Sequence, residues 1–340
     1  METFKKIAVL LFRISISFAL LIFLFRGVDK KTLFSLIKNA DKALLFFSFC
    51  IFLGTHLLGF MRWNMLLRSA RINLPVKRVI MSFAGGIFFS LFLPSTIGGD
   101  FVRSVDLAAH TKKPKEVVAT VFLDRLSGYI GLVSITLLGL LIGFEYVRDR
   151  VVFVSVGIIV FILLIVLVVL FNRGVYQKIN KLAGKKSSKT NNKFRLVLER
   201  LKDNIASVHQ EIHRFRGRKK IIVKNLMLSF IIQLIVPVSF SLIGLSLGIK
   251  VPIFYFFIFL PIIGAITLLP VSMGGLGLRD ATMIYFFAKA GVSKDLAFAM
   301  SLINFSYVLI CGAIGGFIYV LTVRHRRVQC NSSLLIRARS

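Results

Sequence analysis

Long hydrophobic stretches dominate this chain, and short polar or charged stretches separate them. A helix needs about 19 apolar residues to cross a hydrocarbon core, and windows of that length predict six membrane-spanning helices. These spans cover about residues 7 to 25, 43 to 60, 126 to 147, 151 to 171, 221 to 247 and 296 to 323. The pattern is typical of an all-α integral membrane protein.

Two shorter apolar runs, at 79 to 93 and 252 to 269, each end at a cluster of proline and glycine. Proline removes a backbone donor, and glycine weakens a helix, so neither run predicts a simple span. We expect each to form a re-entrant or broken-helix hairpin. The expected fold is therefore a bundle of six full spans plus two hairpins, with up to eight spans if the hairpins cross.

Composition agrees with this pattern, because 56% of the residues are hydrophobic and the mean hydropathy is +0.83. No stretch is long and polar enough for a separate soluble domain, so we expect residues 1–340 to form one polytopic membrane domain. The N-terminus has a basic start and an apolar core, as a signal peptide does. Its core is long and no small-residue cleavage site follows, so a retained first span is expected.

The net charge of +31 raises the question of a nucleic-acid partner. The basic residues lie mostly in loops between apolar runs, which indicates the positive-inside rule and not nucleic-acid binding. Residues 172–220 carry 15 Lys and Arg against 3 acidic residues, and residues 324–340 carry 5 against none. We expect both segments, and both termini, to be cytoplasmic. The short basic segment 61–78 is expected on the same side.

Within the basic loop, hydrophobic residues recur every three or four positions over 194–215. They are Phe194, Leu198, Leu201, Ile205, Val208, Ile212 and Phe215. This spacing predicts an amphipathic helix. It could dock on the bundle or on lipid headgroups, or bind a soluble or membrane partner as a coiled coil.

The two interrupted runs carry the same motif at a constant offset of 176 residues, 93-LPSTIGGDFVRS-104 and 269-LPVSMGGLGLRD-280. The same offset relates the flanking spans, so we expect repeat 1 at about 43–147 and repeat 2 at about 219–323. The charge-based topology places the two hairpins on opposite faces. The sequence therefore predicts inverted repeats, an arrangement typical of transporters.

In such transporters, broken helices aim their N-termini at an anionic group. We expect the motif glycines to let backbone N–H groups approach that ligand, and Thr96 and Ser272 to cap the second half of each hairpin. Arg103 and Arg279 would then clamp a phosphate. The structural alternative is that the glycines serve close helix packing and the arginines extend to headgroups.

A second charged pair, Asp124–Arg125, lies at the head of a predicted span. Adjacent positions face different sides of a helix, so we expect Arg125 to face the bundle interior while Asp124 pairs elsewhere. Headgroup contact at the cytoplasmic end is the alternative. His56 lies within a span, where a hydrogen-bonded core histidine is favoured over a proton relay.

The stretches LPSTIGGDFVRS, FLDRLSGY and LPVSMGGLGLRDAT occur here in this order. Together they resemble the transmembrane region of lysylphosphatidylglycerol synthases, also called the flippase-like domain family, over about residues 5 to 325. The resemblance implies a plasma-membrane protein that moves lipids between leaflets. It implies binding roles for Pro94, Gly98, Gly99, Asp100, Arg103, Asp124, Arg125, Pro270, Gly274, Gly275, Gly277 and Arg279. Two departures are Asp280, where relatives commonly have Glu, and the absence of an arginine from 297–308.

The expected function is translocation of an anionic or aminoacylated phospholipid, or of another lipid-phosphate, with Asp100 or Asp280 as candidate proton carriers. Family members that transfer amino acids have an additional soluble catalytic domain, and we expect no such domain here. We therefore expect no enzymatic activity, catalytic residue or metal site. No nucleotide-binding motif occurs, and we expect no cofactor. The alternatives are a membrane-embedded transferase acting on polyprenyl-phosphate or phospholipid, and a non-catalytic scaffold subunit.

Overall fold

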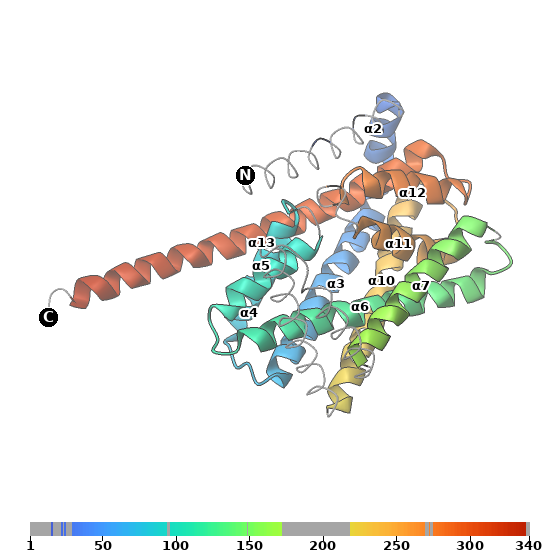
Figure 1. Cartoon of the computed structure of the whole chain (residues 1–340). Coiled ribbons are helices and arrows are strands. Elements are labelled where there is room, and N and C mark those ends of the chain that lie inside the picture. The colour runs from blue at the N-terminus through green and yellow to red at the C-terminus, as the bar shows by residue number, and fades with distance from the viewer. Residues whose placement is uncertain are drawn as a thin grey trace, which may run out of the picture.

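The computed structural model describes residues 29–93, 96–147, 149–171, 218–268 and 275–337, together with positions 15, 22, 24 and 272. All regular secondary structure in these residues is helical, which confirms the predicted all-α fold (Figure 1). The helices are α2 (Lys30–Asn39), α3 (Lys42–Ser69), α4 (Val76–Ser90), α5 (Thr96–Ala108), α6 (Pro114–Gly143), α7 (Arg150–Phe171), α10 (Lys219–Ser246), α11 (Ile253–Thr267), α12 (Leu278–Ala288) and α13 (Lys294–Arg337).

Five helices in the described residues are long and apolar enough to cross a membrane, namely α3, α6, α7, α10 and α13. Five of the six predicted spans fall on these helices. The first predicted span, 7–25, lies almost entirely outside the described residues, as does the predicted amphipathic helix 194–215. The chain is therefore a multi-pass membrane protein, and its full number of spans stays a prediction.

Three of the predicted boundaries are wrong. Helix α3 continues through Ser69, so the first part of the predicted loop 61–78 is helical. Helix α6 begins at Pro114, which places Asp124 inside the helix and not at its head. Proline suits the first position of a helix because its missing N–H would have no intrahelical partner there. Helix α13 continues to Arg337, beyond the predicted end of its span at 323.

Helices α3 and α10 pack side by side and run antiparallel. The Ser48 hydroxyl donates to the Ser239 carbonyl at 2.8 Å, and the Ser239 hydroxyl donates back to the Ser48 carbonyl at 3.0 Å. Further along α3, Arg62 Nη1 donates to Ser229 Oγ at 2.9 Å. Residue numbers rise along α3 as they fall along α10. Equivalent helices of two inverted repeats would be related in this way.

The first two helices of the set α3–α6 have the same lengths as the first two helices of the set α10–α13. Helices α3 and α10 each have 28 residues, and α4 and α11 each have 15. A second short helix follows in each set, α5 in the first and α12 in the second, so each set contains a hairpin of two short helices. Helix α4 packs against α13, and α11 packs against α6 (Figure 1).

Glycines permit this crossed packing between the two sets. A Cβ atom added at Gly315 of α13 would lie 2.6 Å from the Ala84 carbonyl oxygen of α4. One added at Gly139 of α6 would lie 2.9 Å from Phe257 Cβ of α11. Small residues at such contacts allow helices to approach closely, which is a main source of association energy in a bilayer. Helix α13, the last of the second set, therefore packs closely against α4 of the first set. Helix α6, the last of the first set, packs closely against α11 of the second set.

A charged pair outside the long helices joins the start of α7 to the end of α12. The Lys289 ammonium donates to Asp149, and this contact together with the Val151 and Val152 amides holds the pKa of Asp149 below its usual value. A lowered folded-state pKa contributes stability above the unfolded-state value of about 3.9, and this stability is lost as the pH falls through the folded-state pKa.

We expect Asp149→Asn to reduce the acid dependence of stability. The melting temperature of purified protein between pH 6 and pH 3 checks this, with a smaller decrease expected in the variant than in the wild type. Both side chains are partly exposed, so the effect is expected to be small. An unchanged slope would show that the pair contributes nothing to acid sensitivity.

Candidate functional site

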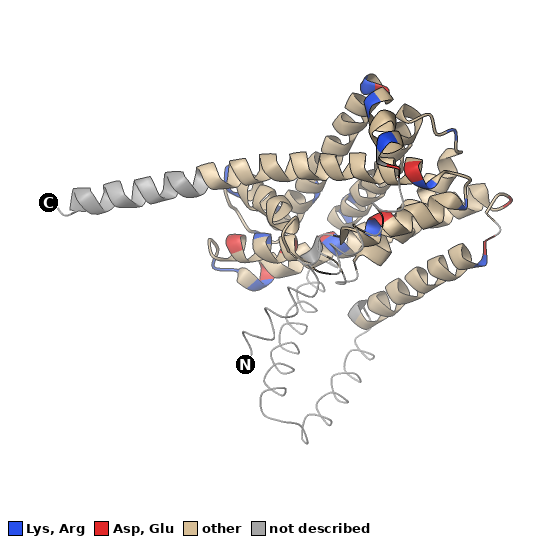
Figure 2. Ribbon diagram, turned by 90° about the horizontal axis from the view of Figure 1, so that it is seen from above, with Lys and Arg blue, Asp and Glu red and all other residues tan. Residues whose placement is uncertain are grey.

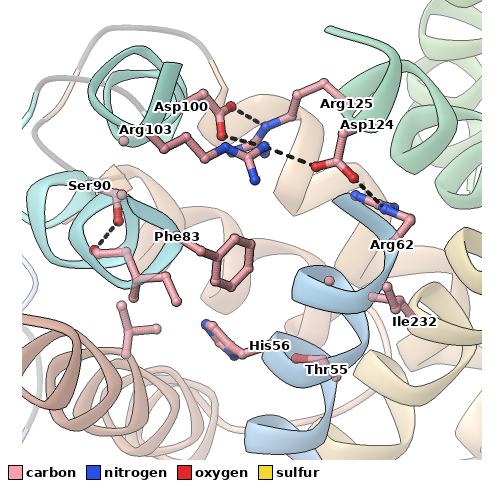
Figure 3. A pocket seen from close by; sticks show the side chains of 15 residues that line it. Thr55, His56, Arg62, Phe83, Ser90, Asp100, Arg103, Asp124, Arg125 and Ile232 are labelled. Atoms are coloured by element: carbon pink, nitrogen blue, oxygen red, sulfur yellow. Dashed lines mark hydrogen bonds and ion pairs between the residues drawn. The ribbon is translucent and has the colours of Figure 1, made fainter. Parts of the chain in front are cut away.

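Five charged side chains from three helices form one buried network in the first helix set (Figure 3). Figure 2 colours the positions of the charged residues on the backbone ribbon. They are Arg62 of α3, Asp100 and Arg103 of α5, and Asp124 and Arg125 of α6. Arg62 Nε donates to Asp124 Oδ1 at 2.7 Å, and Arg103 Nη2 donates to Asp124 Oδ2 at 2.9 Å. Arg103 Nη2 also lies 3.0 Å from Asp100 Oδ1, and Arg125 Nε donates to Asp100 Oδ2.

Arg103 is the centre of this network. It contacts both carboxylates, and its guanidinium lies 4.6 Å from the centroid of the Trp63 ring and 5.6 Å from that of Phe83. Cation–π contacts of this kind strengthen where water is excluded. Arg103 Nε and Trp63 Nε1 are buried without a hydrogen-bond partner among the described residues. The two rings and the two carboxylates together surround this guanidinium.

The network borders a cavity of about 360 Å³. Figure 3 shows the charged side chains along one wall, with His56 and Thr55 of α3 on the facing side. The cavity is also lined by Ile232 of α10 and Val308 of α13, so both helix sets enclose it. Such a space is in the size range of small-ligand pockets.

The network carries an excess of one positive charge, from three guanidinium groups against two carboxylates. Burial of charge is costly unless partners compensate, and here each carboxylate has two arginine partners. Arg125 is the most exposed of the five, with 38% of its side chain accessible, whereas the other four are at most 11% accessible. The arrangement can therefore attract one anionic group, and Arg125 is the arginine most available to contact it.

The residues of the second motif form a separate cluster. Arg279 Nη2 donates to Asp280 Oδ1 at 2.9 Å, and its Nε donates to Ser301 Oγ at 3.2 Å. The Arg279 guanidinium lies 5.1 Å from the centroid of Phe305. Asp280 also accepts from the Gly277 amide at 2.9 Å. None of these residues lines the cavity at Arg103, so the described residues of the second motif do not share that cavity with Arg103.

The predicted cap of the half-helix in the second motif differs from the structure. Gly277 precedes α12, and the Asp280 side chain accepts from its amide, so Ser272 is not the cap. Gly275 and Gly277 have φ angles of 79° and 77°, which glycine adopts without strain. Ser272 is buried, and its hydroxyl has no partner among the described residues. Thr96 begins α5, but its side chain, Pro94, Pro270 and Gly274 lie outside the described part of the structure.

The first-motif glycines pack tightly inside α5. A Cβ atom at Gly99 would overlap the Gly86 carbonyl oxygen and lie 2.9 Å from Ser90 Cβ, and one at Gly98 would overlap Leu93. These contacts agree with the packing alternative for the glycines. Gly99 also lines the cavity, so its tight packing places the next residue, Asp100, at the cavity wall.

The prediction that Asp124 pairs away from the interior is wrong. Asp124 is 3% exposed and joins the same network as Arg125. The two side chains leave α6 at different angles, so Asp124 contacts Arg103 while Arg125 contacts Asp100, both on α5. His56 is half-buried and lines the cavity, and its Nδ1 lies 3.2 Å from the Phe52 carbonyl oxygen, so the predicted hydrogen bond is present but the side chain borders the cavity.

Arg62 is the site residue that sequence reasoning missed. The sequence placed it in a cytoplasmic loop, whereas it is 9% exposed inside α3. One available signal was the apolar composition of the run around it, 60-FMRWNMLL-67, which favours a continuing helix. In the described residues, no group of three or more His, Cys, Asp or Glu side chains could hold a metal ion.

Comparisons with known proteins agree with the resemblance inferred from the motifs. Residues 10–316 match the lysylphosphatidylglycerol synthase transmembrane region. A UPF0104 membrane protein of Pyrococcus horikoshii is 24% identical over 343 residues, covering 95% of this chain and 99% of that protein. A UPF0104 membrane protein of Methanothermobacter thermautotrophicus is 25% identical over 264 residues, covering 72% and 75%. No solved structure matches. This chain belongs to the lysylphosphatidylglycerol synthase transmembrane-region family.

Proposed function

We propose that this protein translocates a lipid with an anionic headgroup between membrane leaflets. The substrate class is an anionic or aminoacylated phospholipid, or another lipid-phosphate. The observation that carries this proposal is the excess positive charge at the wall of a cavity enclosed by apolar helices. In a membrane interior, ionisable groups are expensive and usually serve a substrate or ion pathway.

The phosphate of the headgroup binds beside Arg125 in this proposal. Arg103 and Arg62 are each paired with Asp124, so they contribute positive charge to the site while they keep this partner. Arg125 has Asp100 as its carboxylate partner, which is itself shared with Arg103. A phosphate can therefore contact Arg125 while Asp100 keeps an arginine partner. Rocking of the two helix sets would then alternate access to the cavity.

Location and topology form part of the same proposal. We place the protein in the plasma membrane with both termini on the cytoplasmic side, because residues 172–220 carry 15 basic residues against 3 acidic ones. No enzymatic activity is assigned. A partner that binds residues 194–215 stays a prediction from the sequence.

The test is movement of labelled phosphatidylglycerol between leaflets of proteoliposomes that contain the purified protein. Arg125→Gln is expected to slow movement by at least about tenfold, the effect of about 1.4 kcal/mol of lost interaction. Arg68→Gln is a matched control, because Arg68 is an exposed arginine on α3 outside the cavity. It is expected to keep the wild-type rate. Melting temperatures establish that both variants are folded.

Other outcomes would lead to other assignments. Absence of movement with phosphatidylglycerol, its aminoacylated form and a polyprenyl-phosphate would contradict translocation. If product then formed from a lipid-phosphate donor, the protein would be a transferase. If Arg279→Gln slowed movement as much as Arg125→Gln, the arginine of the second motif would contact the substrate as well, as the sequence predicts for Arg279.

A further inference from the structure

A second cavity of about 360 Å³ lies between α6, α7 and α11. Its lining is almost entirely hydrocarbon, because ten of its twelve residues are apolar. Leu126 and Val133 line it from α6, Leu163 and Val166 from α7, and Ala265 from α11. Arg125 and Tyr129, one helical turn apart on α6, are its two polar-tipped residues. We call this space the apolar cavity, and the cavity beside Arg103 the polar cavity.

Among the described residues, Arg125 alone lines both cavities. Its guanidinium contacts Asp100 in the polar cavity, and the same side chain borders the hydrocarbon wall of the apolar cavity. An arginine combines an apolar stem with a charged head, so it can border both environments. The two cavities therefore meet at the charged group that is most available to a phosphate.

The rim of the apolar cavity faces the surroundings of the bundle. Phe122 and Ile162 line it and are 36% and 56% exposed. Helix α7 presents further hydrophobic side chains outward, among them Val154, Ile158, Phe161 and Ile165. In a bilayer this rim contacts lipid. A cavity lined by hydrocarbon does not hold water stably, so lipid chains are the natural occupants of such a space.

We propose that the apolar cavity holds one hydrocarbon chain of the lipid whose phosphate lies at Arg125. This inference rests on the proposed function and adds where the chain goes. An amphiphile with an anionic head and an apolar tail matches two adjoining spaces, one polar and one apolar, with a cation at their junction. A free phosphate would occupy the polar cavity alone.

The apolar cavity gives the lipid chain a path into the protein but contributes little to the binding free energy. A chain that moves from the bilayer into an apolar cavity exchanges one hydrocarbon environment for another, so the hydrophobic effect contributes little. The headgroup, however, can reach the polar cavity only if its attached chain has a continuous apolar space. Filling the apolar cavity should therefore weaken binding of an intact lipid.

A lipid with a photoreactive chain tests the proposal. The probe is phosphatidylglycerol with a diazirine near the middle of one acyl chain, added to the purified full-length protein in lipid nanodiscs. Mass spectrometry of the cross-linked peptides is expected to find the label on α6 near Leu126 and on α7 near Val166. Val166→Trp is expected to reduce this labelling by about tenfold, because the tryptophan side chain would occupy the space that the acyl chain needs.

Matched variants separate the cavity from the surrounding lipid. Leu164→Trp adds the same side chain on the exposed side of α7 and is expected to leave labelling of α6 unchanged. Ala265→Phe fills the cavity from α11 and is expected to act like Val166→Trp. Arg125→Gln is expected to reduce labelling as well, because the headgroup then loses its cation. If none of Val166→Trp, Ala265→Phe and Arg125→Gln reduced the labelling, the label would come from the surrounding bilayer lipid. That result would overturn the inference.

The two proposals can fail separately. If phosphatidylglycerol moves between leaflets and both Val166→Trp and Ala265→Phe keep the wild-type rate and labelling, the chain site is wrong and translocation stands. If the labelling depends on Arg125 and on the cavity residues but no lipid moves, the chain site stands as a lipid-binding site and translocation is wrong.

Discussion

Asp124→Asn is expected to lower the free energy of unfolding by about 3–5 kcal/mol, the usual cost of breaking a buried ion pair by removing one partner. Asparagine keeps the shape of the side chain and removes its charge. Arg62 and Arg103 both donate to Asp124, so the variant leaves two buried guanidinium groups with a neutral partner. Arg103 retains Asp100, whereas Arg62 retains only the Ser229 hydroxyl among its described contacts. The junction of α3, α6 and α10 should therefore loosen first.

Reversible unfolding of purified protein in mixed micelles, followed by circular dichroism, measures this effect. Asp149→Asn is the matched control, because it makes the same substitution in a partly exposed pair. Exposed pairs contribute little, so the control should stay near wild type at neutral pH. A loss of less than about 1 kcal/mol in Asp124→Asn would mean that water or lipid headgroups already compensate these arginines.

Gly99→Ala is expected to separate α4 from α5. A methyl group at Gly99 would overlap the carbonyl oxygen of Gly86, which is backbone and cannot rotate away. Forcing extra atoms into a packed interface costs about 1–3 kcal/mol and sometimes more. Because Asp100 follows Gly99 directly, the displacement should also move its carboxylate relative to Arg125. We expect both a lower melting temperature and slower lipid movement.

Gly157→Ala provides the control for that experiment. Gly157 lies within α7, and a Cβ atom there would meet nothing within 4 Å. The same glycine-to-alanine change should then be neutral or stabilise the helix, by up to about 1 kcal/mol. If Gly99→Ala behaved like Gly157→Ala, the close approach of α4 and α5 would not be needed for stability.

Much of the helix arrangement could be predicted from the sequence. The constant offset between the two glycine motifs predicted two interrupted hairpins, and α4–α5 and α11–α12 lie at those positions. Five of the predicted spans correspond to long apolar helices. These features are readable because apolar length and glycine–proline interruptions are local properties of a chain.

The composition of the charged network was harder to predict. Arg62 and Asp124 are 62 positions apart, and each alone reads as an end of an apolar segment. Burying either charge alone would cost much free energy, and the partner lowers this cost. A search of short sequence segments does not detect such a pair, because its members lie far apart in the chain. The motifs and the family resemblance located Asp100, Arg103, Asp124 and Arg125, but the pattern placed Arg62 in a loop, and the helix-face argument placed the Asp124 partner away from the interior.

The role of the motif glycines also depends on the folded neighbours. From sequence, a paired glycine predicts either an exposed amide or a close contact. The overlap between a Cβ at Gly99 and Gly86 identifies a close contact there. At the second motif, a positive φ at Gly275 and Gly277 identifies a local turn. The motif glycines therefore have different roles in the two halves, a close helix contact in the first and a turn in the second.

The unequal charge of the two clusters bears on the energy of a passing anion. The first cluster has three guanidinium groups for two carboxylates, whereas Arg279 and Asp280 balance each other. Under the proposed function, an anion that passed these two described clusters would meet an electrostatic well at the first cluster and no equal well at the second. A carrier must bind strongly enough to admit its cargo and weakly enough to release it. In the proposed function, the depth of the well at Arg125 would then set the rate of release in both directions.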